Sequence, residues 1–215
     1  MWQEEEPMIK RIILLIGIAV FFSSCAAVHK PILLHNNFTR PIKVAVLPFA
    51  NETSDLTAGE LFRELFYYGL KEKDYELIPM EVIDKKLNAI GITDGGQLPS
   101  IGQDELIKEL GVSGLIYGTL KKCQYLTTGI YKKKEVIGNI KVYKNGDLYW
   151  EDEITVTKKE FGLNPIKGLQ EQVTNKFFEG AFKKYAGHPL YAHIENMVYQ
   201  LQATMPGKRE EVSGW

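Results

Sequence analysis

The chain has 215 residues, and its 26 lysines and arginines almost balance 27 aspartates and glutamates, so the formal net charge is −1. This balance excludes the basic excess that is typical of nucleic-acid-binding proteins, and we expect no nucleic-acid partner. The length is enough for one domain with a substantial apolar core.

Residues 1–24 carry the pattern of a secretory signal peptide. Lys10 and Arg11 precede an apolar run of 11 residues, Ile12–Phe22, which is too short to span a bilayer. The residues before Met8 are acidic, where a signal peptide needs positive charge, so we expect translation to start at Met8. The alternative is an N-terminal helix that is not cleaved.

A cysteine follows the apolar run at the position of a bacterial lipidation site. We predict cleavage before Cys25 and a diacylglycerol on its thiol, an anchor that several acyl chains make effectively permanent. Ala26 stands where an aspartate would favour the inner membrane, so the outer membrane is expected. Acylation of Cys25 leaves Cys123 without a disulfide partner. The lipobox consists of Phe22, Ser23 and Ser24, with phenylalanine where leucine is usual.

The segment after the anchor mixes histidine, asparagine and proline without a sustained period. We interpret residues 25–41 as a lipidated tether, with Ile32–Leu34 docking on the domain that follows. Residues 42–187 form the predicted α/β domain, and residues 188–215 form a C-terminal helix and tail.

The domain opens with a β-branched run, Ile42–Leu47, which predicts a buried strand that stops before Pro48. Thr57 and Glu60 have the spacing of a capping box, so a helix is expected to begin there and to continue to about Lys73. Its apolar stripe consists of Leu61, Phe62, Leu65, Phe66 and Leu70.

A short strand and two helices are predicted next. Tyr75–Ile78 is the strand, and Met80–Ile90 is a helix that ends at Gly91. Gln103–Leu110 is the following helix, ended by Gly111. The side chains expected to face inward are Val82, Ile83, Leu87, Ile90, Leu106, Ile107 and Leu110.

From Val112 the apolar period becomes two, which predicts antiparallel strands at 115–125, 136–143 and 148–157. A two-residue turn at Asn145-Gly146 would pair Ile140 with Glu151, whereas a three-residue loop pairs Ile140 with Trp150. Burial favours the second register, with Gly146 left-handed at a bulge. It gives one apolar face made of Val136, Ile140, Val142, Leu148, Trp150 and Ile154.

Two helices are predicted to close the domain. Asn164-Pro165 is a good start for a helix to about Ala186, and Pro189 begins another that ends before Pro206. The order β-α-β-α-α-β-β-β-α-α indicates the α/β class, as a single mixed-sheet sandwich with helices mainly on one face.

Four segments carry a resemblance to a known family: Val44–Ser54, Gly111–Gly118, Asn145–Trp150 and His188–Tyr191. Over residues 41–207 the chain resembles a bacterial lipoprotein family of unknown function, typified by the neisserial GNA vaccine-candidate antigen. Through its first strand it is distantly similar to CsgG, LpoB and the amino-terminal domain of TolB. The resemblance implies an anchored, periplasm-facing module that binds partner proteins and also forms a homo-oligomer. The family has no established catalytic activity, so the resemblance assigns no catalytic residues.

The search for chemistry gives no enzyme, no cofactor and no metal site. His188 and His193 would lie about 140° apart around a helix axis, which does not suit a shared ion. Cys123 lies in a strand pattern with no histidine nearby in sequence, so a small core residue is expected. Asp94-Gly95-Gly96 lacks the lysine of a phosphate loop.

Two surface features are candidates for binding. Asn51 and Thr53 form a motif loop after the first strand, which serves either the turn alone or a ligand. Tyrosines are favoured at interfaces, although strands are rich in them for other reasons. The candidate partner surface consists of Tyr125, Tyr131, Tyr143 and Tyr149.

Together these observations predict an outer-membrane-anchored, periplasm-facing lipoprotein. We expect it to be a non-catalytic interaction module of a cell-envelope secretion or transport assembly with envelope protein partners. The alternative is an LpoB-like activator of peptidoglycan synthesis, and an enzyme acting on glycans or peptides is a third class. The three differ in what the protein binds.

Overall fold

The computed structural model describes residues 29–35, 41, 43–73, 75–161, 183–185 and 187–206. A compact unit, residues 31–215, contains all the described helices and strands. The signal peptide, the lipobox, Cys25 and positions 164–182 of the helix predicted at 164–186 lie outside the described residues. Within them, no helix is both long and apolar enough to cross a bilayer.

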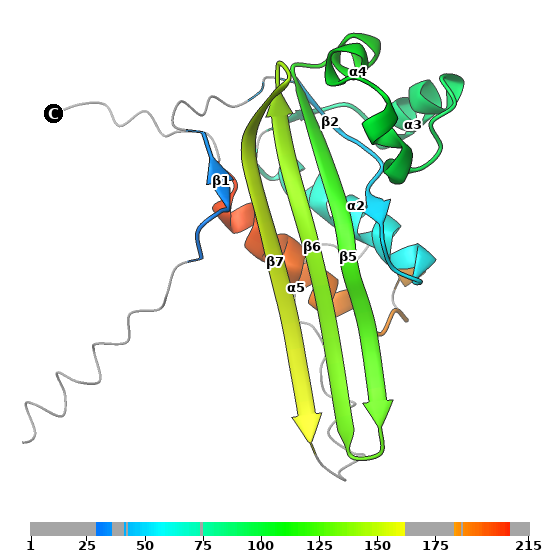
Figure 1. Cartoon of the computed structure of the whole chain (residues 1–215), viewed down its shortest axis with the longest axis vertical. Helices are drawn as coiled ribbons and strands as arrows, with labels where there is room; N and C mark the ends of the chain where they lie inside the picture. The colour runs from blue at the N-terminus through cyan, green and yellow to red at the C-terminus, as the bar shows by residue number, and fades with distance from the viewer. Residues whose placement is uncertain are drawn as a thin grey trace, which may run out of the picture. The chain divides into compact units, whose positions relative to one another are not determined.

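One mixed sheet organises the unit, as the sequence predicted, and it contains seven strands where five were expected (Figure 1). Its order is β1-β7-β6-β5-β2-β4, with β3 also paired to β5. Strand β2 is parallel to β4 and β5, whereas β5, β6 and β7 form consecutive antiparallel hairpins. The strands are β1 (Leu33–Leu34), β2 (Lys43–Val46), β3 (Ala50–Asn51), β4 (Glu76–Leu77), β5 (Gly114–Thr128), β6 (Tyr131–Lys144) and β7 (Asp147–Phe161).

Strand β1 comes from the segment that the sequence assigned to the tether. Leu33 pairs with Glu151 and Leu34 with Trp150, both on β7. Just beyond it, the His35 N–H donates to the Tyr149 carbonyl at 2.9 Å. The segment therefore forms the edge strand of the sheet beside β7.

Helices pack against both faces of the sheet. Alternate residues of β2 point to opposite sides and so belong to two different cores. Val44 and Val46 face the core beneath α2 (Leu56–Lys71) and α5 (Tyr191–Thr204). Ala45 and Leu47 belong to a second core. Three short helices enclose that second core: α3 (Met80–Ala89), the 3-10 helix η1 (Gly95–Ser100) and α4 (Gln103–Leu110). A 3-10 turn, η4 (Lys183–Tyr185), precedes α5.

The helix predictions need two corrections. Helix α2 is capped by Asp55 and not by Thr57, because the Asp55 carboxylate accepts from the Thr57 and Ala58 N–H groups. Val82 and Ile90 are 43% and 42% exposed, since only one side of α3 reaches the second core. The predicted left-handed glycines, Gly91 and Gly111, have φ values of +85° and +67°.

The predicted register of the β6–β7 hairpin is wrong. Lys144 pairs with Asp147 across a two-residue Asn145-Gly146 turn, in which both φ values are positive as a type I′ turn requires. A bulge at Tyr149 then shifts the pairing, so Val142 lies opposite Trp150. Of the six residues assigned to the apolar face, five are buried and Leu148, before the bulge, points to the other side. The observed cross-strand pairs are Val142–Trp150, Ile140–Asp152, Gly138–Ile154 and Val136–Val156.

Strands β5, β6 and β7 are longer than predicted and extend past the ends of α2 and α5 (Figure 1). We call their far part, residues 121–135 and 155–161, the distal arm. Positions 124–130 of this arm are all exposed. The face of β5–β7 opposite α2 and α5 is not covered by any described helix beyond β2 and the start of β5 (Figure 1). We call it the open face.

Candidate functional site

The motif loop after β3 is a turn that holds its own polar groups. Asn51 Oδ1 accepts from the Thr53 N–H at 3.0 Å and from the Thr53 hydroxyl at 2.8 Å. Asn51 Nδ2 donates to the Asp55 carbonyl at 2.8 Å, and the Asp55 N–H donates to the Thr53 hydroxyl. Asn51 and Thr53 are therefore committed to the turn, which fixes the backbone of Asp55 at the start of α2.

Asp55 uses both carboxylate oxygens. Oδ1 accepts from the Thr57 and Ala58 N–H groups at 3.2 Å, which caps α2. Oδ2 lies 2.8 Å from His188 Nε2, although the two residues are 133 positions apart in sequence. Burial acts to raise the pKa of Asp55, but the hydrogen bonds from His188 and Thr57 outweigh it and the pKa is lowered. The charged carboxylate is thus the favoured form.

His188 lies just before α5, and its side chain is only 7% exposed. Its Nδ1 accepts a hydrogen bond from the Leu190 N–H at 3.2 Å. A neutral imidazole has one protonated nitrogen, so the proton lies on Nε2 and is donated to Asp55. Both nitrogens of His188 are therefore engaged.

Cys123 of β5 completes this cluster. One ligand-type atom from each of Asp55, Cys123 and His188 lies within 4.8 Å of the other two. Burial, with a smaller effect from the charge of Asp55, raises the pKa of the Cys123 thiol to about 12. The thiol is consequently protonated at neutral pH.

Cysteine, histidine and aspartate are the residue types of a thiol nucleophile or of a transition-metal site. A nucleophile needs a thiolate and a histidine nitrogen free to take its proton, and here the thiol is protonated and both nitrogens are engaged. A metal would need Nε2 without its proton, which the Leu190 contact disfavours. The Asp55–His188 hydrogen bond joins the start of α2 to the segment before α5, and Cys123 of β5 lies within 4.8 Å of both. We call these three residues the latch.

Sequence reasoning missed the latch because its members come from three distant segments. It treated Cys123 as lacking a histidine neighbour, and the chain brings His188 to it only through the fold. One signal was present: Asp55 directly follows the Val44–Ser54 segment, and His188 opens the His188–Tyr191 segment. Both segments carry the family resemblance, and the structure shows that their ends meet.

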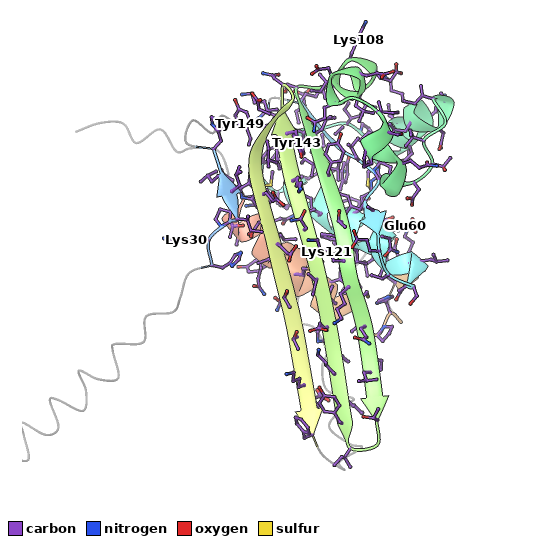
Figure 2. The ribbon with its side chains drawn as sticks, in the orientation of Figure 1. Lys30, Glu60, Lys108, Lys121, Tyr143 and Tyr149 are labelled. Atoms are coloured by element: carbon purple, nitrogen blue, oxygen red, sulfur yellow. The ribbon has the colours of Figure 1, made fainter. Side chains whose placement is uncertain are left out.

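The four candidate tyrosines do not form one surface. Tyr143 and Tyr149 lie near the Asn145-Gly146 turn, at the end of strands β5–β7 that is opposite the distal arm (Figure 2). Tyr149 stacks on His35 with 4.9 Å between ring centroids, and Tyr143 meets Tyr117 edge-on at 5.3 Å. These contacts make one rigid aromatic pair on each side of the hairpin.

The other two tyrosines belong to the distal arm and point to opposite faces. Tyr125 lies opposite Lys134 on the side of α5, with the ammonium 5.4 Å from its ring centroid. Tyr131 lies on the open-face side, where its ring is 4.9 Å from that of Phe161. The candidate surface is thus split into two ends and two faces.

Residues 35–176 match the protein family described as "Putative lipoprotein GNA1162-like". The chain belongs to this family. The resemblance predicted from the four sequence segments is confirmed, and membership implies attachment to a membrane through a lipid. No curated protein sequence matches the chain significantly.

Three solved structures are similar to the chain to different degrees. Lipoprotein GNA1162 from Neisseria meningitidis is 14% identical, with a TM-score of 0.54 over 77% of this chain and 100% of that chain. The PelC dodecamer from Paraburkholderia phytofirmans is 14% identical, with a TM-score of 0.46 over 80% and 92%. The C-terminal domain of LpoB from Salmonella enterica is 11% identical, with a TM-score of 0.36 over 56% and 86%. The first likeness shows a shared fold.

Proposed function

We propose that the protein is a non-catalytic interaction module of a cell-envelope secretion or transport assembly, anchored through Cys25 to the periplasmic face of the outer membrane. Family membership supports the lipid anchor. Ala26, in place of an aspartate, supports the outer membrane. The two finer statements, the assembly and the absence of catalysis, rest on the open face and on the latch.

The open face is the observation that carries this proposal. It is a polar surface whose side chains pair across strands: Lys121 with Glu153, and Asn139 and Lys141 with Glu151. The Tyr117–Tyr143 ring pair borders it near the hairpin turn. Interfaces between separately folded partners are about as polar as the rest of a protein surface and are enriched in tyrosine.

The latch supports a non-catalytic role. Its chemistry is directed inward, to capping a helix and holding a histidine, and its thiol is held in the unreactive protonated form. A group that reacts with a substrate needs a free lone pair aimed at it. The lone pairs of Asp55 and His188 that the structure describes accept hydrogen bonds from within the latch and from backbone N–H groups.

Site-specific photocrosslinking in intact cells tests the proposal. The lipidated protein would carry a benzophenone amino acid at Tyr143, beside the open face. The matched control carries it at Tyr199, a 72% exposed tyrosine on α5. We expect a discrete protein adduct from position 143 and none from position 199. Adducts from neither position, or equal adducts from both, would overturn the proposal.

The identity of the adduct then separates the candidate assemblies. A transport or secretion component, or a second copy of the chain, agrees with the proposal. A peptidoglycan synthase as the main adduct would replace it with the activator role predicted as the alternative.

A further inference from the structure

The end of the distal arm exposes apolar side chains in a compact group. Strands β5 and β6 are joined by a two-residue turn, Gly129-Ile130, and Tyr131 pairs with Thr128 on one side and Phe161 on the other. Phe161 is 76% exposed, Ile130 56% and Leu126 40%. Exposed apolar groups of this kind mark contact sites. We call Leu126, Ile130, Tyr131 and Phe161 the apolar tip.

Lysines gather directly behind this tip. The distal arm contains seven lysines and two glutamates, a net charge of +5, whereas the rest of the chain, with 19 basic and 25 acidic residues, carries −6. Lys133 lies opposite Lys159, and Lys134 lies opposite Lys158. Like charges directly opposite on neighbouring strands destabilise a sheet. Two such pairs side by side are therefore unfavourable for folding and point to an external anionic partner.

Part of this charge is free to meet a partner. Glu135 pairs with Lys122 and Lys133, and Glu160 pairs with Lys158. The described residues show no ion pair for the remaining three lysines of the distal arm, although Lys134 also lies over the Tyr125 ring. These three, which we call the collar lysines, are Lys132, Lys134 and Lys159.

We propose that the end of the distal arm docks on a bilayer surface that contains anionic phospholipid. The apolar tip enters the headgroup region, and the collar lysines contact lipid phosphates while their stems extend along the tip. Ile130, Tyr131 and Phe161 form the end of the arm, and the collar lysines occupy the next three rows, with Leu126 beside them. This order matches the layering of a bilayer interface. Because the family is lipid-anchored, such a surface is always within reach of the protein.

Vesicle co-sedimentation tests the proposal apart from the anchor. The mature polypeptide from residue 25, made without export and with Cys25→Ala, has no acyl chain and retains the whole compact unit. We expect it to bind vesicles of phosphatidylcholine with phosphatidylglycerol and not vesicles of phosphatidylcholine alone. Each lysine near an anionic surface contributes about a fivefold factor, so K132Q/K134Q/K159Q should weaken binding by on the order of 100-fold.

A matched variant separates local from overall charge. K71Q/K85Q/K108Q changes the net charge equally on α2, α3 and α4, and we expect it to bind almost as the parent does. A second tip variant, I130S/F161S, should also lose binding and keep the circular dichroism spectrum of the parent. Equal losses in both lysine triples, or no binding by the parent, would overturn the proposal. If the parent binds heparin but not vesicles, and K132Q/K134Q/K159Q loses the heparin binding, the proposal is overturned and the partner is a soluble polyanion.

Discussion

The bulge in β5 gives the sharpest test of how this fold places its side chains. Leu120 pairs with Gly138 and Lys122 with Ile137, so Lys121 is an extra residue in β5. Lys121 and Lys122 both pair with open-face glutamates, and Cys123 then faces the other two latch residues, Asp55 and His188. The extra residue therefore reverses which residues of the strand face α2 and α5.

Two single-residue deletions distinguish this reasoning from a general intolerance of shortened strands. Deleting Lys121 removes the extra residue and leaves Leu120 and Cys123 on their present sides. It removes the Lys121–Glu153 ion pair, whose side chains are 43% and 31% exposed and which is worth at most about 1 kcal/mol. Deleting Thr119 also removes the bulge, but it moves Lys121 into the position of Leu120, which is 0% exposed.

Loss of a buried leucine destabilises a protein by about 2–5 kcal/mol, before any cost of burying a lysine. We therefore expect the Thr119 deletion to be at least about 2 kcal/mol less stable than the Lys121 deletion in urea denaturation followed by circular dichroism. For a chain of this size the gap corresponds to a difference in Tm of roughly 4–8 °C or more. Equal stabilities, or a less stable Lys121 deletion, would refute the reasoning.

Four further predictions concern the latch and the anchor. Asp55→Ala should lower the free energy of unfolding by about 2–3 kcal/mol, because it removes both the cap of α2 and the hydrogen bond to His188. Asp94→Ala is the control: it removes only a cap from η1 and should lower the free energy of unfolding by about 1 kcal/mol. Because folding lowers the pKa of Asp55, its stabilisation is present above the ordinary value of 3.8 and disappears as the pH falls below it, so urea titrations of wild type and Asp55→Ala should converge in acid. Cys123 should react with iodoacetamide slowly in the native protein at pH 8 and rapidly in urea, and equal rates would contradict its burial and raised pKa. Mass spectrometry of the N-terminal peptide should show diacylglycerol on Cys25, and globomycin should leave the signal peptide attached; an unmodified Cys25 would exclude the anchor.

Local patterns in the sequence predicted the elements well, because each reflects forces within a few residues. The apolar stripe of α2 and the alternation in β5–β7 follow from burial on one side of an element. The Gly91 and Gly111 helix ends follow from the conformational freedom of glycine. The start of α2 was misplaced because Asp55 and Thr57 are both good caps, and the Asn51–Thr53 turn, which selects Asp55, depends on hydrogen bonds that the sequence does not display.

The sequence did not predict the two bulges or the contacts between distant segments, and the reason is physical. A period of two tells which residues share a face, but an inserted residue reverses the pattern without changing composition. Tyr149 and Lys121 are such residues, and each lies within an otherwise regular strand. The latch could not be predicted from the sequence partly for the same reason, because Cys123 points toward His188 only when Lys121 is an extra residue in β5.

The bulge in β5 and the latch lie where the covered part of the sheet gives way to exposed strands, and this placement has a mechanical consequence. On the side of α2 and α5, Cys123 at the base of the distal arm packs against the core beside the bonded pair of Asp55 and His188. On the open face, the Lys121–Glu153 and Lys122–Glu135 pairs hold the same base across β5, β6 and β7. A three-stranded ribbon that is fixed on both faces at its base can extend without covering helices and keep one direction. Such rigidity is what a contact arm needs, because a partner or a bilayer then binds it without first ordering it.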